Sequence, residues 1–208
     1  MALTSQYDPL FARYQGRLPV AFLRALAQRE SSMRPELAMP GGAGAARGLL
    51  QVVGVVRDDY NQRHGTSYTA DDLFNPDVNV KIAAGLINQI VAAYGKHPSR
   101  NLKEDWTNPE FVKLLVMGWN AGFSESGGVG KVAAMLEREG TPVTHDTVYA
   151  NAARAGAAPY LSMPDRIAWH RSVADLYYAQ PDWNATGVGI GTLLFAGALA
   201  FAAYHVLK

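Results

Sequence analysis

The chain has 208 residues, 49% of them hydrophobic, which is enough for one well-packed domain with a short additional segment. Its formal net charge of +1 gives no basic field of the kind that nucleic-acid-binding proteins use, so we expect no nucleic acid partner. The absence of cysteine excludes disulfides, thiolate metal sites and cysteine nucleophiles, but it leaves the cellular compartment open.

Residues 1–17 are polar and aromatic, and we interpret them as an N-terminal arm without the apolar stretch of a secretory signal peptide. The first long helix is predicted to begin near Pro19 and to end around Ser32. On this helix Phe22, Leu26 and Glu30 follow one another at intervals of four, so Glu30 projects from the apolar face. Desolvation there would raise the pKa of its carboxyl group and suit it to donate a proton, although a rim glutamate paired with an arginine is the alternative.

The following segments are also predicted to be helical. Leu49–Tyr60 favours a second helix, although its paired valines equally suggest a strand. Val78–Tyr94 is predicted as a helix because its apolar residues recur at helical spacing. Four more helices are expected, at Phe111–Ala121, Lys131–Arg138, Thr147–Ala155 and Pro164–Ala179. The sequence therefore predicts an all-α domain over residues 18–180.

The last segment, residues 181–208, has a different composition. Residues 186–207 contain no aspartate, glutamate, lysine or arginine, and as a helix this length matches the roughly 30 Å hydrocarbon core of a bilayer. Trp183 and Tyr204 would suit the two interfaces, so we predict a C-terminal transmembrane helix that anchors the protein in a membrane, with a buried core helix as the alternative. Glycines at 187, 191 and 197 offer a small-residue face for self-association or for docking into a larger membrane, virion or ejection assembly.

Four short motifs follow one another along the domain. They are Glu30-Ser31, Gly48-Leu49-Leu50-Gln51, Asn79-Val80 and Gly118-Trp119-Asn120-Ala121-Gly122. In order and spacing they resemble the Glu-Ser, Gly-Leu-Met-Gln, Asn-Ile and Ala-Tyr-Asn-Ala-Gly motifs of the soluble-lytic-transglycosylase family, over roughly Leu18 to Gln180. The resemblance implies a goose-type lysozyme-like fold that cleaves the glycan strands of peptidoglycan.

In that family one glutamate protonates the leaving oxygen and then takes the proton of the C6 hydroxyl, which closes a 1,6-anhydro ring on the muramoyl product. The resemblance assigns this catalytic role to Glu30. A single acid is chemically sufficient because the nucleophile already lies within the substrate. No second acid occupies a motif position: the pairs Asp58-Asp59 and Asp71-Asp72 are candidates by residue type, and they are better interpreted as solvated surface pairs.

The resemblance also implies substrate contacts. Ser31 would touch the N-acetylmuramoyl group, with a hydroxyl bonded to a backbone carbonyl as the alternative. The amide of Gln51 could bond a sugar or, alternatively, the backbone, and Asn120 is expected to contact substrate in the cleft. Trp119 replaces the family's tyrosine: it keeps a flat platform for a sugar ring but loses the hydroxyl. Asn79 is expected to be structural.

A late tyrosine of the family touches the catalytic acid. Trp169 is the nearest match by pattern and is our candidate for this position, with Tyr149 and Tyr160 as rivals. The five histidines are scattered without metal-ligand spacing, so neither a metal nor another cofactor is expected.

Together these patterns predict a membrane-associated peptidoglycan lytic transglycosylase. A bacteriophage virion protein that opens the cell wall locally as the phage genome enters the cell is the favoured setting. A bacterial inner-membrane enzyme with its domain facing the periplasm is the alternative. The alternative function is a non-catalytic glycan-binding or structural module of a membrane or ejection assembly.

Overall fold

The computed structural model describes residues 5–181, and helices supply the regular structure of this part of the chain. Extended pairing there is limited to the isolated bridges Ala38–Arg47 and Arg47–Val52. The prediction of an all-α domain is therefore confirmed. The helices are α1 (Asp8–Tyr14), α2 (Val20–Ser31), α3 (Gly54–His64), α4 (Pro76–Tyr94), α5 (Pro109–Ala121), α6 (Val129–Arg138), α7 (His145–Asn151) and α8 (Pro164–Tyr178), with short 3-10 turns at Gly42–Gly44, Asp71–Phe74, Arg100–Leu102 and Pro159–Ser162.

Helix α2 lies where the sequence predicts it. Pro19 precedes it in an extended conformation, and the chain leaves the helix at Ser32, which adopts the left-handed conformation with φ of 53°. Residues 21–27 are buried on it, so this helix is held by core packing over most of its length. Glu30 follows in the last turn, where the helix leaves the core and reaches a cleft.

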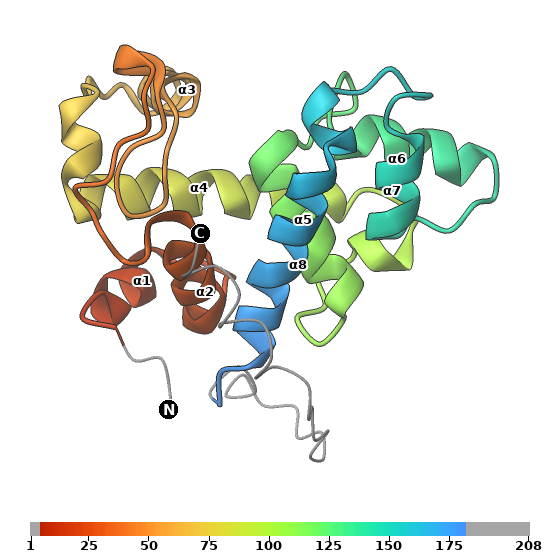
Figure 1. The fold of residues 1–208 in the computed structure, drawn as a ribbon, viewed down its shortest axis with the longest axis horizontal. Coiled ribbons are helices and arrows are strands. Elements are labelled where there is room, and N and C mark those ends of the chain that lie inside the picture. The colour runs from red at the N-terminus through yellow and green to blue at the C-terminus, as the bar shows by residue number, and fades with distance from the viewer. Residues whose placement is uncertain (1–4, 182–208) are drawn as a thin grey trace, which may run out of the picture.

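Two capped helices form the centre of the molecule. Asn75 accepts a hydrogen bond from the backbone N–H of Asp77 at 2.9 Å and begins α4, and Asn108 does the same for Glu110 at 3.0 Å and begins α5. α4 crosses the molecule from the side of α1 and α3 to the side of α5, α6 and α7 (Figure 1). α8 runs beside both α2 and α5, so it closes one side of the space between them (Figure 1).

The stretch before α3 differs from the prediction. The sequence leaves a helix or a strand open for Leu49–Tyr60, and the structure has helix α3, which begins only at Gly54. Gly48 and Gln51 adopt positive φ values of 78° and 48°, which break any helix at this point. The side chain of Asn79 holds the turn, because its Oδ1 accepts from Leu50 N at 2.8 Å and its Nδ2 donates to the Leu73 carbonyl at 2.9 Å. The expectation that Asn79 is structural agrees with this geometry.

The N-terminal arm contains a helix, α1, that the sequence analysis does not predict. Its Phe11 is fully buried in the core. Its Asp8 accepts two hydrogen bonds, at 3.0 and 2.9 Å, from the guanidinium of Arg24 on α2, which is only 3% exposed. The same guanidinium donates at 2.6 Å to Gln180 just beyond α8, so one buried arginine connects the beginning and the end of the described chain.

The predicted transmembrane helix over residues 186–207 lies outside the described residues. Within residues 5–181 no helix has both the length and the apolarity needed to cross a bilayer.

Candidate active site

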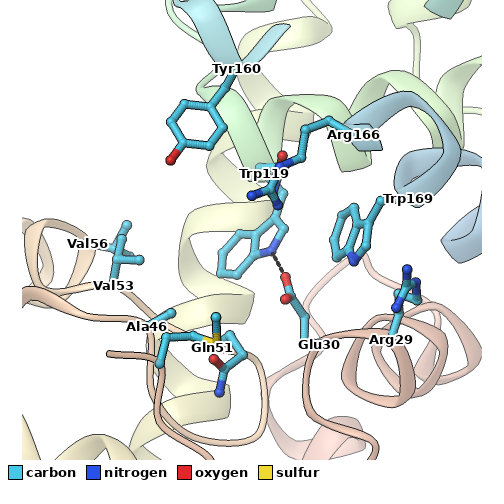
Figure 2. A pocket seen from close by; sticks show the side chains of 12 residues that line it. Arg29, Glu30, Ala46, Gln51, Val53, Val56, Trp119, Tyr160, Arg166 and Trp169 are labelled. Carbon is cyan, nitrogen blue, oxygen red and sulfur yellow. Dashed lines mark hydrogen bonds between the residues drawn. The ribbon is translucent and has the colours of Figure 1, made fainter. Parts of the chain in front are cut away.

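A cleft of about 620 Å³ opens beside the end of α2, a size within the range of roughly 300–1,000 Å³ that small-molecule sites occupy. One wall comes from α2, from the segment between α2 and α3 and from the first turn of α3, and the other comes from α5, α8 and the turn before α8 (Figure 2). The lining side chains are Arg29, Glu30, Met39, Ala46, Gln51, Val53, Val56, Trp119, Asn120, Tyr160, Arg166 and Trp169. The cleft thus brings together residues from the first, second and fourth motifs.

Glu30 is the only carboxylate among the described residues that line the cleft. Burial raises the pKa of its carboxyl group from the ordinary 4.5 to about 7, against the opposing effects of the Trp119 hydrogen bond and of the positive charges of Arg166 and Arg29. A carboxyl group with this pKa is both a proton donor and, once ionised, a proton acceptor near neutral pH. The prediction that desolvation would raise this pKa is confirmed in its direction.

Trp119 holds Glu30 directly. Its indole Nε1 donates a hydrogen bond of 2.7 Å to Glu30 Oε1 (Figure 2). Because an indole N–H can only donate, Oε1 has to accept in both protonation states of the acid. When Glu30 is protonated, its proton therefore lies on Oε2, the oxygen left for the substrate.

Trp119 has no phenol hydroxyl, but its indole N–H gives the acid a hydrogen bond that the motif alone does not predict. The preceding residue, Gly118, allows α5 to pass close to α4. A Cβ at Gly118 would lie 2.3 Å from the hydroxyl oxygen of Tyr94, which is fully buried and donates to the Leu114 carbonyl at 3.0 Å. The position of Trp119 over Glu30 depends on this close approach.

Ser31 turns away from the cleft. It is 1% exposed, and its hydroxyl lies 3.2 Å from the carbonyl oxygen of Ala27 and 2.8 Å from that of Leu49, and it accepts from the N–H of Arg34. This is the backbone-bonding alternative that the sequence leaves open. The hydroxyl ties the end of α2 to the Gly48–Gln51 turn, while a direct contact with a muramoyl group remains a prediction.

Gln51 lines the cleft but is also fixed to the backbone. Its Nε2 donates to the carbonyl oxygens of Leu37 and Gly48, at 3.0 and 2.9 Å. Both bonds use the amide nitrogen, so the group that Gln51 can offer a sugar is its carbonyl oxygen, an acceptor. A structural bond to the backbone and a contact with a sugar are therefore compatible roles for Gln51.

Asn120 follows Trp119 on the cleft wall. Its Oδ1 is buried and has no hydrogen-bond partner among the described residues. A buried polar atom without a partner is costly, and a donor from a bound ligand would satisfy it. This geometry supports the predicted substrate contact of Asn120.

Two of the three late aromatic residues lie at the cleft. Trp169 and Tyr160 line it, whereas Tyr149 is not among the described lining residues. The aromatic group hydrogen-bonded to Glu30 is Trp119, which comes from the fourth motif. Arg29 and Arg166 also line the cleft, although no motif marks either of them and the one available signal is that Arg29 adjoins Glu30 in the chain.

The other acid candidates lie outside the cleft lining. Asp58 pairs with Arg57 at 2.7 Å and Asp59 pairs with Arg63, as solvated surface acids do. Asp71 and Asp72 are equally peripheral: the first lies 3.6 Å from Arg47 and the second accepts from Thr69. In the described part of the chain no three His, Asp or Glu side chains gather as metal ligands.

Comparison with known families identifies the domain. The family model described as the Transglycosylase SLT domain matches residues 10–135. The chain belongs to the SLT transglycosylase domain family. Membership agrees with the enzyme class predicted from the motifs, a peptidoglycan lytic transglycosylase. A comparison with curated proteins finds no significant match.

Solved structures give the same fold. The SLT domain resembles the 70 kDa soluble lytic transglycosylase SLT70 from Escherichia coli, with a TM-score of 0.55 and 17% sequence identity. The match covers 83% of this chain and 24% of the length of SLT70. At this identity the likeness shows the fold, and the chain spans about a quarter of the structure that it matches.

Proposed function

We propose that this SLT-domain protein cleaves the β-1,4 bond between N-acetylmuramic acid and N-acetylglucosamine of peptidoglycan and leaves a 1,6-anhydromuramoyl product. The observation that carries the proposal is Glu30, the one carboxyl group among the described residues that line the cleft, with a pKa raised to about 7 and one oxygen fixed by an indole N–H. Ordinary glycosidases need a pair of carboxyl groups, one on each side of the bond. A cleft with one carboxyl group favours a reaction in which that group acts twice.

In the first step protonated Glu30 gives the proton on Oε2 to the glycosidic oxygen. The bond from the muramoyl C1 to this oxygen breaks, and the N-acetylglucosamine side leaves with a new hydroxyl group. The N-acetyl carbonyl of the substrate stabilises the positive charge that develops at C1. The Trp119 N–H stabilises the carboxylate that Glu30 becomes.

In the second step the carboxylate of Glu30 removes the proton of the C6 hydroxyl. The oxygen of that hydroxyl bonds to C1 and closes the anhydro ring, and Glu30 returns to its protonated state. No water is consumed, so proton and bond changes balance within one substrate molecule. Intramolecular attack gives the C6 hydroxyl the high effective concentration that replaces a second catalytic carboxylate.

The test compares Glu30→Gln with wild type in the clearing of a peptidoglycan suspension. Glutamine keeps the shape and an oxygen that accepts from Trp119, but it cannot cycle a proton. We expect activity to fall by at least about 10²- to 10⁴-fold, the usual contribution of acid–base catalysis. The matched control is Glu104→Gln, because Glu104 also accepts from an indole, that of Trp106 at 3.2 Å, at an exposed site away from the cleft.

A Glu30→Gln protein that keeps activity within a few-fold of wild type would remove Glu30 from this role. A wild type that binds peptidoglycan with no cleavage at any pH would instead favour the non-catalytic glycan-binding module. Binding and cleavage are therefore measured on the same preparation.

We further propose that the enzyme acts at a membrane and in a phage particle, where it opens the wall as the genome enters the cell. A bacterial inner-membrane enzyme facing the periplasm is the second setting. Support for the membrane part comes from the apolar sequence of residues 186–207, which contains no aspartate, glutamate, lysine or arginine. Flotation of the full chain with liposomes, but not of a chain ending at Asn184, tests the membrane part, and detection in purified virions tests the phage part.

A further inference from the structure

Two arginines face the cleft without a matching set of acids. Arg29 on α2 and Arg166 on α8 both line it, and Glu30 is the only carboxylate among the described lining residues. When Glu30 is protonated, as the first catalytic step requires, the lining retains two positive charges and no negative one. A neutral sugar chain offers nothing to compensate such charges, whereas a carboxylate does.

Arg29 is positioned rather than loosely solvated. Its Nε donates to Ser172 Oγ at 2.8 Å, and its guanidinium lies 5.9 Å from the centre of the Trp169 ring. The Ser172 hydroxyl is itself bonded to the Trp169 carbonyl oxygen at 2.7 Å. These contacts use the Nε side of the guanidinium, so its terminal amino groups remain available to a ligand.

Arg166 approaches from the other wall. Its guanidinium lies 5.3 Å from the centre of the Tyr160 ring, and its Nε is buried with no hydrogen-bond partner among the described residues. Its nearest acid is Asp165, at 3.9 Å and with a side chain 77% exposed, which makes a weak partner. The buried N–H is a donor that a bound acceptor would satisfy.

The two arginines flank one aromatic platform. Figure 2 shows Trp169 between them, with the end of the Arg166 side chain extending toward Trp119 above Glu30. An indole face stacks on a sugar ring, and a guanidinium at its edge can reach a substituent of that ring in a two-pronged hydrogen bond. This combination recognises a sugar that carries an acid.

We propose that Arg29 and Arg166 are specificity-determining residues that bind a carboxylate carried by the muramoyl residue next to the scissile bond. The inference rests on the proposed function and adds to it the part of the substrate that is recognised. The carboxylate has two possible sources. One is the lactyl group, which is free on strands without peptide, and the other is the stem peptide, which brings its own carboxylates when it is attached.

The test measures binding by calorimetry at fixed pH and salt, and every protein in it carries Glu30→Gln so that the strands are bound without being cleaved. In the binding comparisons, wild type denotes this background with both arginines intact, and it is compared with Arg29→Gln and Arg166→Gln. Three ligands are used: glycan strands with stem peptides, the same strands after amidase treatment, and amidase-treated strands whose lactyl carboxyl groups have been reduced to alcohols. Wild type should bind one or both acidic ligands roughly ten- to a hundredfold more tightly than the reduced strands, since a charge-assisted hydrogen bond contributes enough for one to two powers of ten. Each variant should lose most of this preference.

The matched control is Arg13→Gln, which removes an exposed arginine that pairs with Asp77 at 3.0 Å and does not line the cleft. It should keep the wild-type preference. A preference for the amidase-treated strands identifies the lactyl carboxylate, and a preference only for strands with stems identifies the peptide.

Equal affinity of wild type for acidic and reduced strands would overturn the proposal, and so would an unchanged preference in both arginine variants. Circular dichroism and the unfolding midpoint of each variant separate a lost contact from a lost fold. Because binding is read without turnover, a failure of catalysis in wild type would reject the proposed function and still leave this result decisive for the arginines.

Discussion

The hydrogen bond from Trp119 to Glu30 makes a sharp prediction about pH dependence. Trp119→Phe removes the indole N–H but keeps an aromatic ring in the cleft wall. The lost donor stabilises the ionised form of Glu30, since the bond lowers the pKa that burial raises. Its removal should therefore raise the pKa of Glu30 above the present value of about 7.

The size of the change follows from the 2.7 Å length of the bond and from its charged acceptor. Hydrogen bonds to charged groups contribute about 1.5–3 kcal/mol, and about 1.4 kcal/mol corresponds to one pH unit. Water can enter the vacated space at the edge of an open cleft and replace part of the bond. We therefore expect the lower end of this range, a rise of about one unit.

The assay is the pH profile of kcat/KM for the release of soluble fragments from peptidoglycan. Activity of the free enzyme requires protonated Glu30, so the alkaline limb reports its pKa and should move to higher pH in Trp119→Phe. The control, Trp106→Phe, removes an indole N–H that donates to Glu104 outside the cleft. The alkaline limb of this variant should stay where it is in wild type. An unmoved or acid-shifted limb in Trp119→Phe would refute the assigned role of the indole.

Three further predictions concern stability, each read by urea unfolding. The free energy of unfolding of Glu30→Gln should match that of wild type near pH 4 and exceed it by up to about 3 kcal/mol above pH 7. The reason is that the pKa of Glu30 is about 7 in the folded protein and 4.5 in the unfolded chain, so ionisation on raising the pH destabilises the wild-type fold. An equal gain at both pH values would contradict this. Gly48→Ala should lose several kcal/mol or fail to fold, since its Cβ would meet the Leu73 carbonyl oxygen at 2.1 Å at a φ of +78°; near-wild-type stability would count against the turn geometry. Asp8→Ala should cost roughly 3 kcal/mol by removing a carboxylate partner of the buried Arg24, and a loss below about 1 kcal/mol would place that pair among ordinary surface ion pairs.

The sequence was sufficient for elements whose signals are local. The helical spacing of apolar residues along α4 and the Pro19 start of α2 are signals carried by neighbouring residues, and these helices lie where predicted. The periodicity that put Glu30 on the apolar face of α2 also gave the direction of its pKa shift. These inferences needed no knowledge of the packing partner.

The structure differs from the sequence predictions where contacts between distant segments override the local conformational preference. The sequence left helix and strand open from Leu49, and neither extends through the Gly48–Gln51 turn, because Asn79, almost thirty residues later, bonds this turn. The hydrogen bond from Trp119 to Glu30 could not be predicted from the sequence for the same reason, since it joins α5 to α2. Arg166 could not be assigned to the cleft before the position of α8 beside α2 was known.

The central claim is that one carboxyl group, Glu30, acts as acid and then as base without water. Mass spectrometry of glycan strands digested by the full chain tests it most directly. We expect muramoyl ends lighter by one water than the hydrolytic product, with no matching rise in reducing sugar. Glu30→Gln should release neither anhydromuramoyl ends nor reducing ends. Free muramoyl reducing ends as the main product would contradict it, because they require an activated water and a second catalytic acid.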